Sequence, residues 1–179
     1  MNAFSVLWRA VLGWLDLLTA RPDAAEKFTL TRTGLVNAAG FYIAAVLAVL
    51  VIEVGLSGFP GWGAVALSLA VNIARLAGIW LVAWLTVRAM GGSFLGIVVP
   101  ATYAMGFVLV LALPLAYLAG SNVTVALLGV RAFLFYRAAR QLGGLGLGIS
   151  VAFGILCIVV LAAIPLGLYM LTGGGLATG

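Results

Sequence analysis

The amino-acid sequence predicts an all-α integral membrane bundle of five transmembrane helices, preceded by an N-terminal amphipathic helix at the membrane interface. Of its 179 residues, 65% are hydrophobic and 7% are charged, and the mean hydropathy is +1.30. Soluble domains typically carry about 25% charged residues, so this composition excludes an ordinary soluble enzyme. Five apolar runs are of the length needed to cross a hydrocarbon layer about 30 Å thick.

Residues 1–33 are the first predicted region, a cytoplasmic amphipathic helix followed by a polar linker. On a helical wheel, the apolar face of this helix holds Phe4, Leu7, Trp8, Val11, Trp14, Leu15 and Leu18. The opposite face holds Ser5, Arg9, Gly13 and Asp16. This pattern favours a helix lying in the membrane interface, with Trp8, Arg9 and Trp14 at that interface. A cleaved signal peptide is the alternative, but Arg9 and Asp16 interrupt the apolar core that a signal peptide needs.

Residues 34–179 are the predicted transmembrane domain, with apolar runs at approximately 34–56, 64–87, 94–118, 122–140 and 147–171. The short connections rich in Gly predict that consecutive helices are antiparallel neighbours. The fourth run is the weakest span, because only about fourteen residues separate Val123 from Arg137. Two ladders of small residues predict close helix packing or oligomerisation: Gly40, Ala44 and Ala48, and Gly144, Gly148 and Ala152.

The basic residues predict the orientation of these spans. If five spans alternate, the same side of the membrane receives Arg9, Arg21, Lys27, Arg32, Arg88, Arg137 and Arg140. The loops on the opposite side carry no charge, so the positive-inside rule predicts a cytoplasmic N-terminus and a periplasmic C-terminus. Eight of the nine bases are Arg, which together with the Ala and Gly content suggests a bacterial protein of the inner membrane. The net charge of +5 then reflects orientation and anionic lipids, and no nucleic acid is expected.

The inventory of reactive side chains predicts a protein that is not an enzyme. With no His and one Cys, the chain lacks the groups for a zinc site, a Ser-His or Cys-His pair, or an internal disulfide. Of its four acids, only Glu53 lies inside an apolar run, which excludes a pair of carboxylates within the membrane. We therefore expect no catalytic residue, no metal site and no cofactor.

Charged residues inside apolar spans are costly, so they are the candidate functional residues. They are Glu53, Arg75 and Arg131. On the second span Ser68 and Asn72 share a helix face with Arg75, and on the fourth span Thr124 shares a face with Arg131. Glu53 is the only acid able to neutralise either Arg, although the helical rise places it about 10 Å nearer the outside than Arg75.

Two interpretations of these polar residues stay open. They hold helices together or contact a partner subunit, or they bind an anionic lipid or a small anion. Transport is disfavoured, because the five spans show no inverted repeat and contain one acid. We expect a scaffold, assembly factor or accessory subunit of a larger membrane complex, whose partners are membrane lipids and other membrane subunits or further copies of the chain.

The order of the segments resembles the Yip1-domain family of membrane proteins. Three segments carry the resemblance: LLTARPDAAEKF before the first span, RAMGGSFLGIVVPATYAM with Gly91, Gly92, Ser93, Phe94 and Tyr103, and LLGVRAFLFYRAARQLGG in the fourth span. The resemblance covers nearly the whole chain and implies five spans after a cytoplasmic start. It also implies a role without catalysis, and it assigns no catalytic residue.

Overall fold

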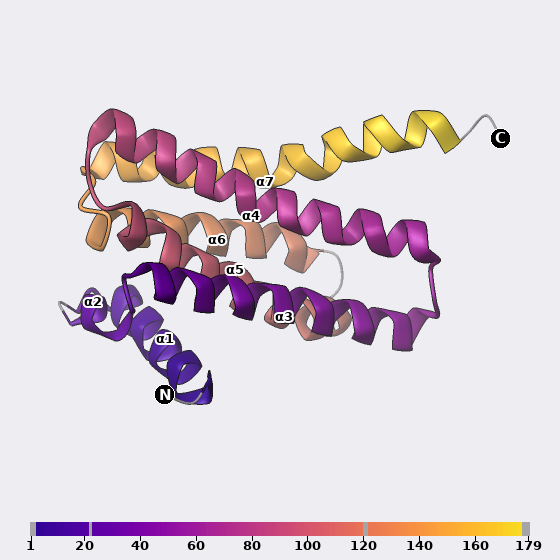
Figure 1. Cartoon of the computed structure of the whole chain (residues 1–179), viewed down its shortest axis with the longest axis horizontal. Coiled ribbons are helices and arrows are strands. Elements are labelled where there is room, and N and C mark those ends of the chain that lie inside the picture. The colour runs from indigo at the N-terminus through magenta and orange to yellow at the C-terminus, as the bar shows by residue number, and fades with distance from the viewer. Residues whose placement is uncertain (1–2, 22, 120–121, 177–179) are drawn as a thin grey trace.

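The computed structural model describes residues 3–21, 23–119 and 122–176, and within them the chain is all-α, with seven helices and no strand (Figure 1). The helices are α1 (Ala3–Leu18), α2 (Ala24–Lys27), α3 (Arg32–Ser57), α4 (Trp62–Met90), α5 (Phe94–Ala119), α6 (Asn122–Gln141) and α7 (Leu147–Leu176). The all-α class predicted from composition is confirmed.

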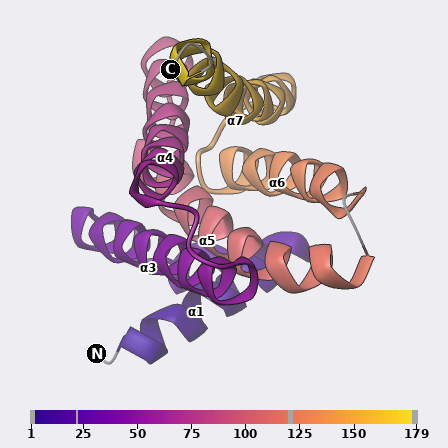
Figure 2. The same ribbon diagram turned by 90° about the vertical axis from the view of Figure 1, so that its right-hand side faces the viewer.

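The five long helices α3 to α7 lie side by side and alternate in direction (Figure 1). We call the end that holds α1, α2 and the α4–α5 and α6–α7 connections the α1 end, and the opposite end, with the α3–α4 connection, the far end. Figure 2 shows α5 crossing the middle of the bundle. It packs on α3 and α6, whereas α4 packs chiefly on α7.

Burial is concentrated in α5. Two thirds (67%) of its most apolar 18-residue window is buried, against 17% to 28% for α3, α4 and α7. The residues from Ile97 to Met105 near the start of α5 are almost fully enclosed. The other helices therefore present most of their apolar surface outward, as helices in contact with lipid do.

Four helices, α3, α4, α5 and α7, are long and apolar enough to cross a membrane. They coincide with the first, second, third and fifth predicted spans. The fourth predicted span is the helix α6, which has about the 30 Å length of a span but does not reach their apolarity, because Arg131, Arg137 and Arg140 fall within its 20 residues. Five spans thus stay a prediction.

Gly13 and Asp16, two residues of the α1 face that we expected to be polar, lie against the protein, whereas Arg9 on the same face is exposed. Asp16 is 5% exposed, and a Cβ added to Gly13 would lie 2.7 Å from the Phe28 ring. The exposed side of α1 carries Trp8, Leu15 and Leu18. Asp16 departs from the expected position because it forms ion pairs inside the chain with Lys27 and Arg21, so its charge does not require water. The amphipathic interfacial helix itself stays a prediction.

The two predicted ladders of small residues are exposed in this chain, so the expectation that they pack its helices together is wrong. Other glycines make the close approaches. Gly78 of α4 faces Val160 and Ile164 of α7, where a Cβ would lie 2.8 and 2.9 Å away. Gly106 of α5 faces the Phe41 ring at 2.6 Å. Because Ala and Gly are abundant, four-residue spacings of small residues occur by chance. Close packing occurs only where such residues face a neighbouring helix.

Candidate functional site

A chain of polar groups connects α3 to α4 near the middle of the bundle. The Tyr42 hydroxyl lies 3.2 Å from both the backbone carbonyl oxygen and Oδ1 of Asn72, and it can donate to either. The Asn72 side-chain amide donates in turn to the Ser68 carbonyl oxygen at 2.9 Å. Tyr42 is 3% exposed, so its hydroxyl is paired as a buried polar group requires.

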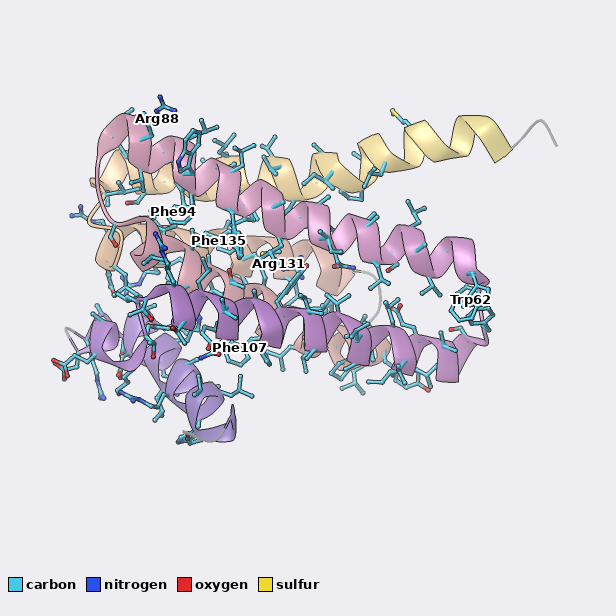
Figure 3. The ribbon with its side chains drawn as sticks, in the orientation of Figure 1. Trp62, Arg88, Phe94, Phe107, Arg131 and Phe135 are labelled. Atoms are coloured by element: carbon cyan, nitrogen blue, oxygen red, sulfur yellow. The ribbon has the colours of Figure 1, made fainter. Side chains whose placement is uncertain are left out.

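Two arginines from different helices complete this region. Arg75 lies one turn after Asn72 on α4, and Arg131 lies at mid-length of α6 (Figure 3). Both guanidinium groups lie within electrostatic range of the Tyr42 hydroxyl and of each other. Because α4 packs chiefly on α7, and α6 on α5 and α7, the two like charges come from helices that are not principal packing partners.

The guanidinium groups are not fully satisfied by the chain. The Nε atoms of Arg75 and Arg131 are buried and have no hydrogen-bond partner among the described residues. A buried donor without a partner costs about 1–3 kcal/mol, and more when it is charged. Such a donor in a native structure needs an explanation, and a missing ligand or partner is one.

No acid of the chain compensates the two charges. Both salt bridges among the described residues use Asp16, at the α1 end. Glu53 is exposed and stands eleven residues after Tyr42 on α3, about 16 Å along the helix axis. The structure therefore does not bring Glu53 to Arg75 or Arg131, and the arginine pair keeps a charge of +2.

The other candidate residues have diverse positions. Ser68 lies beside Asn72 and contributes only its carbonyl oxygen to the polar chain. The Thr124 side chain lies outside the described part of the structure.

The candidate interface residues lie on α1. Trp8 is exposed, whereas Trp14 is 6% exposed and packs edge to face on Phe28 with ring centroids 6.1 Å apart. Arg9 donates to the Glu26 carbonyl oxygen at 3.2 Å.

A second polar cluster anchors α1 at the α1 end. Lys27 donates to the Asp16 carboxylate, and Arg21 lies 3.6 Å from it. Arg137 of α6 donates through Nε to the Leu17 carbonyl oxygen at 2.8 Å and through Nη2 to the Leu17 and Leu18 carbonyl oxygens. A cation is favourable at a helix C-terminus, where the last carbonyl groups lack intrahelical partners. Arg137 is thus a structural cap for α1.

Sequence reasoning missed Tyr42, which links the α3 and α4 parts of the site. The available signal was a Tyr in the middle of an apolar run, because a buried Tyr hydroxyl usually finds a partner. The helical periodicity of α4 predicts that Asn72 and Arg75 share one face. It does not predict which residue of another helix they meet, because that depends on the rotation of α4 and on its packing in the bundle.

Chemically, the site offers charged donors without a base or a nucleophile of its own. Two guanidinium groups can bind a carboxylate or a phosphate through paired hydrogen bonds. Among the described residues, no group of three or more His, Cys, Asp or Glu side chains could hold a metal ion. The positive charge and the hydrogen-bond donors of the two guanidinium groups would suit an anion.

Comparison with known proteins gives no relative: no protein-family model, no curated protein and no solved structure matches this chain. The resemblance to the Yip1-domain family stays a prediction.

Proposed function

We propose that this chain is a non-enzymatic integral membrane protein that acts as a scaffold or accessory subunit, and that Arg75 and Arg131 bind a carboxylate of a partner subunit. The observation that carries the proposal is the pair of neighbouring guanidinium groups, with buried Nε atoms that lack partners and no acid beside them. Ionisable groups within a membrane usually pair with one another. Since the chain supplies no anion, another molecule is expected to.

The depth of the site favours a partner subunit over a lipid headgroup. Arg75 lies about 20 Å from either end of α4, and Arg131 about 14 Å from either end of α6, at 1.5 Å per residue. Headgroups lie about 15 Å from the centre of a hydrocarbon layer about 30 Å thick. An Asp or Glu on a partner's transmembrane helix reaches mid-depth, where the arginines are.

The proposed topology has five spans, with α6 as the fourth and the α1 end in the cytoplasm of a bacterial cell. Arg88, Arg137 and Arg140 belong to the α1 end, whereas the connection at Gly58–Gly61 carries no charge. This asymmetry supports the orientation by the positive-inside rule. In this topology α1 lies along the cytoplasmic leaflet with Trp8, Leu15 and Leu18 toward lipid.

The proposal is tested by recovering the tagged protein from native membranes in mild detergent and identifying stoichiometric partners. We expect Arg75→Met and Arg131→Met to lose a partner subunit that the unsubstituted protein retains. Arg88→Met is the matched control, because Arg88 is exposed at the end of α4. Equal recovery of partners with all three variants would contradict the proposal.

A second candidate is the binding of an anionic lipid or a free phosphate at the same pair. The specific observation in its favour is charge: two guanidinium groups supply +2, which matches a phosphate dianion better than one carboxylate. Native mass spectrometry of the purified protein distinguishes the candidates. A retained phosphate or anionic lipid that Arg75→Met loses would support binding of a small ligand, and a ligand-free spectrum together with a recovered partner would support the subunit.

A further inference from the structure

An apolar groove separate from the arginine pair runs between α1, α5 and α6. Its volume is about 610 Å³. The residues that line it include Trp14 and Leu18 of α1, Phe107 and Leu111 of α5, and Val130 and Phe133 of α6. The groove begins beside the C-terminal turn of α1 and is lined by the middle of α5 (residues 104–111) and of α6 (residues 129–134), so it reaches from the α1 end to mid-length of the bundle.

Basic residues mark the end of this groove that lies next to α1. Arg137 lies one turn after Phe133, and its guanidinium carbon is 5.9 Å from the centre of the Phe133 ring. Arg21 follows Leu18 by three residues, and its side chain is 69% exposed. Asp16 at this end is buried and pairs with both Lys27 and Arg21, so one carboxylate faces these two bases and Arg137 adds a further positive charge. The end of the groove is therefore positive beside an apolar channel.

Trp14 supplies an independent sign of a missing ligand. It lines the groove and is 6% exposed, and its indole Nε1 is buried without a hydrogen-bond partner. Buried indole N–H groups normally donate to an acceptor. Every residue that lines the groove carries an apolar side chain or is Gly, so no side chain of the lining can accept this hydrogen bond, and a ligand in the groove could supply the acceptor.

We propose that this groove binds one acyl chain of an anionic phospholipid from the leaflet at the α1 end. The acyl chain lies along Phe107, Leu111 and Val130, and an ester carbonyl oxygen accepts the Trp14 N–H. The phosphate lies beside Arg21 and Nη1 of Arg137, because Nε and Nη2 of Arg137 already donate to the carbonyl oxygens of α1. The order of groups along the groove is an apolar channel, then one neutral donor, then cationic side chains. This order matches the acyl chain, the ester and the phosphate of a phospholipid. The site is distinct from Arg75 and Arg131, and it would stand if the subunit proposal failed.

Gly129 provides a variant that blocks the groove without disturbing the core. It lines the groove, and a Cβ added to it meets no atom within 4 Å. We expect Gly129→Phe to fill the channel. Gly167→Phe in α7 is the matched control, because a Cβ there also meets no atom within 4 Å and Gly167 is distant from the groove lining.

The experiment is native mass spectrometry of the full chain in mild detergent, titrated with phosphatidylglycerol or with phosphatidylcholine of the same acyl chains. We expect the unsubstituted protein and Gly167→Phe to retain one phosphatidylglycerol at collision energies that remove the others, and Gly129→Phe to lose it. Equal retention by the two glycine variants, or no retained lipid in the unsubstituted protein, would overturn the proposal.

Two further variants separate the headgroup contact from the ester contact. Arg21→Gln should lower the affinity for phosphatidylglycerol about fivefold and leave phosphatidylcholine unchanged, because a base near the surface contributes about 1 kcal/mol toward anionic lipid. Trp14→Phe keeps an aromatic ring but removes the N–H, and it should lower the affinity for both lipids by a similar factor of about five. Unchanged affinity for both lipids in both variants would contradict the assigned contacts.

Discussion

Arg131 and Arg137 lie on the same helix, six residues apart, but their guanidinium groups have different hydrogen-bond partners. Arg137, at the α1 end, donates to the Leu17 and Leu18 carbonyl oxygens and fixes α1 to α6. Arg131, at mid-length, has a buried Nε without a partner and a second guanidinium as its charged neighbour. The chain satisfies Nε and Nη2 of Arg137 with its own backbone, whereas the described residues give Nε of Arg131 no partner. The comparison supports the proposal that Arg137 serves folding and Arg131 serves association.

The same contrast extends to the packing around the two arginines. At the α1 end, Gly96 and Gly143 let α5 and the end of α6 meet at backbone distance, and the Ser93 amide donates to the Gly143 carbonyl oxygen at 2.9 Å. Toward the far end α5 becomes exposed, from Val110 onward. Close packing at one end holds the bundle together, and looser packing toward the other leaves room for a partner.

The largest expected effect is on the packing of the α1 end. A Cβ at Gly96 would lie 2.2 Å from the Leu142 carbonyl oxygen, a backbone atom that cannot rotate away. We expect Gly96→Ala to lower the free energy of unfolding by about 3 kcal/mol, measured by thermal unfolding in detergent. Gly40→Ala is the control, where a Cβ meets nothing within 4 Å and better helix propensity should raise stability by about 0.5–1 kcal/mol. Equal effects would show that the α1 end is not closely packed.

Arg137→Met tests the anchor of α1. It removes the charged donors of the Leu17 and Leu18 carbonyl oxygens, so we expect a loss of about 1–3 kcal/mol in unfolding free energy. Limited proteolysis should also cut between α1 and α3 faster than in the unsubstituted protein. Unchanged stability and cleavage would mean that α1 is held by its apolar contacts alone.

Arg131→Met is expected to act in the opposite direction. Replacing a charge that has no counter-ion by an apolar side chain of similar length should leave the isolated protein as stable or raise its stability by about 1 kcal/mol. The measurement is the same thermal unfolding on the purified, partner-free chain. A clear loss of stability would show that Arg131 is satisfied within the fold, and would remove its contrast with Arg137.

The smallest effect is expected for Glu53→Gln. Glu53 is exposed near the far end and forms no salt bridge in the described structure. Its neutralisation should change the unfolding free energy by less than about 0.5 kcal/mol. A larger loss, abolished when Arg75 is also replaced by Met, would reveal an ion pair between the two residues.

The sequence predicts the helices well because apolar run length is a local property. The run at 64–87, for example, lies within α4, which extends from Trp62 to Met90. The position of Asp16 on α1 was predicted less well. The amphipathic pattern alone places a charged residue such as Asp16 toward water. The tertiary contact with Lys27, eleven residues later, removes its need for water.

Arg75 and Arg131 were identified from the cost of charge within a span, a rule that needs no tertiary information. Their proximity was not predictable, because it depends on the rotation of α4 and α6 and on Tyr42 from a third helix. The groove along Trp14 was also not predictable, since α1 lies more than 80 residues before the α5 and α6 residues that complete it.

The central claim is that the Arg75–Arg131 pair serves an external anion and Arg137 serves the fold. The most direct test compares Arg131→Met with Arg137→Met for thermal stability of the purified chain and for recovery of partners from native membranes. We predict that Arg131→Met keeps its stability and loses the partner, whereas Arg137→Met loses stability. A stable Arg131→Met variant that still recovers every partner, and retains every bound anion of the unsubstituted protein, would contradict the claim.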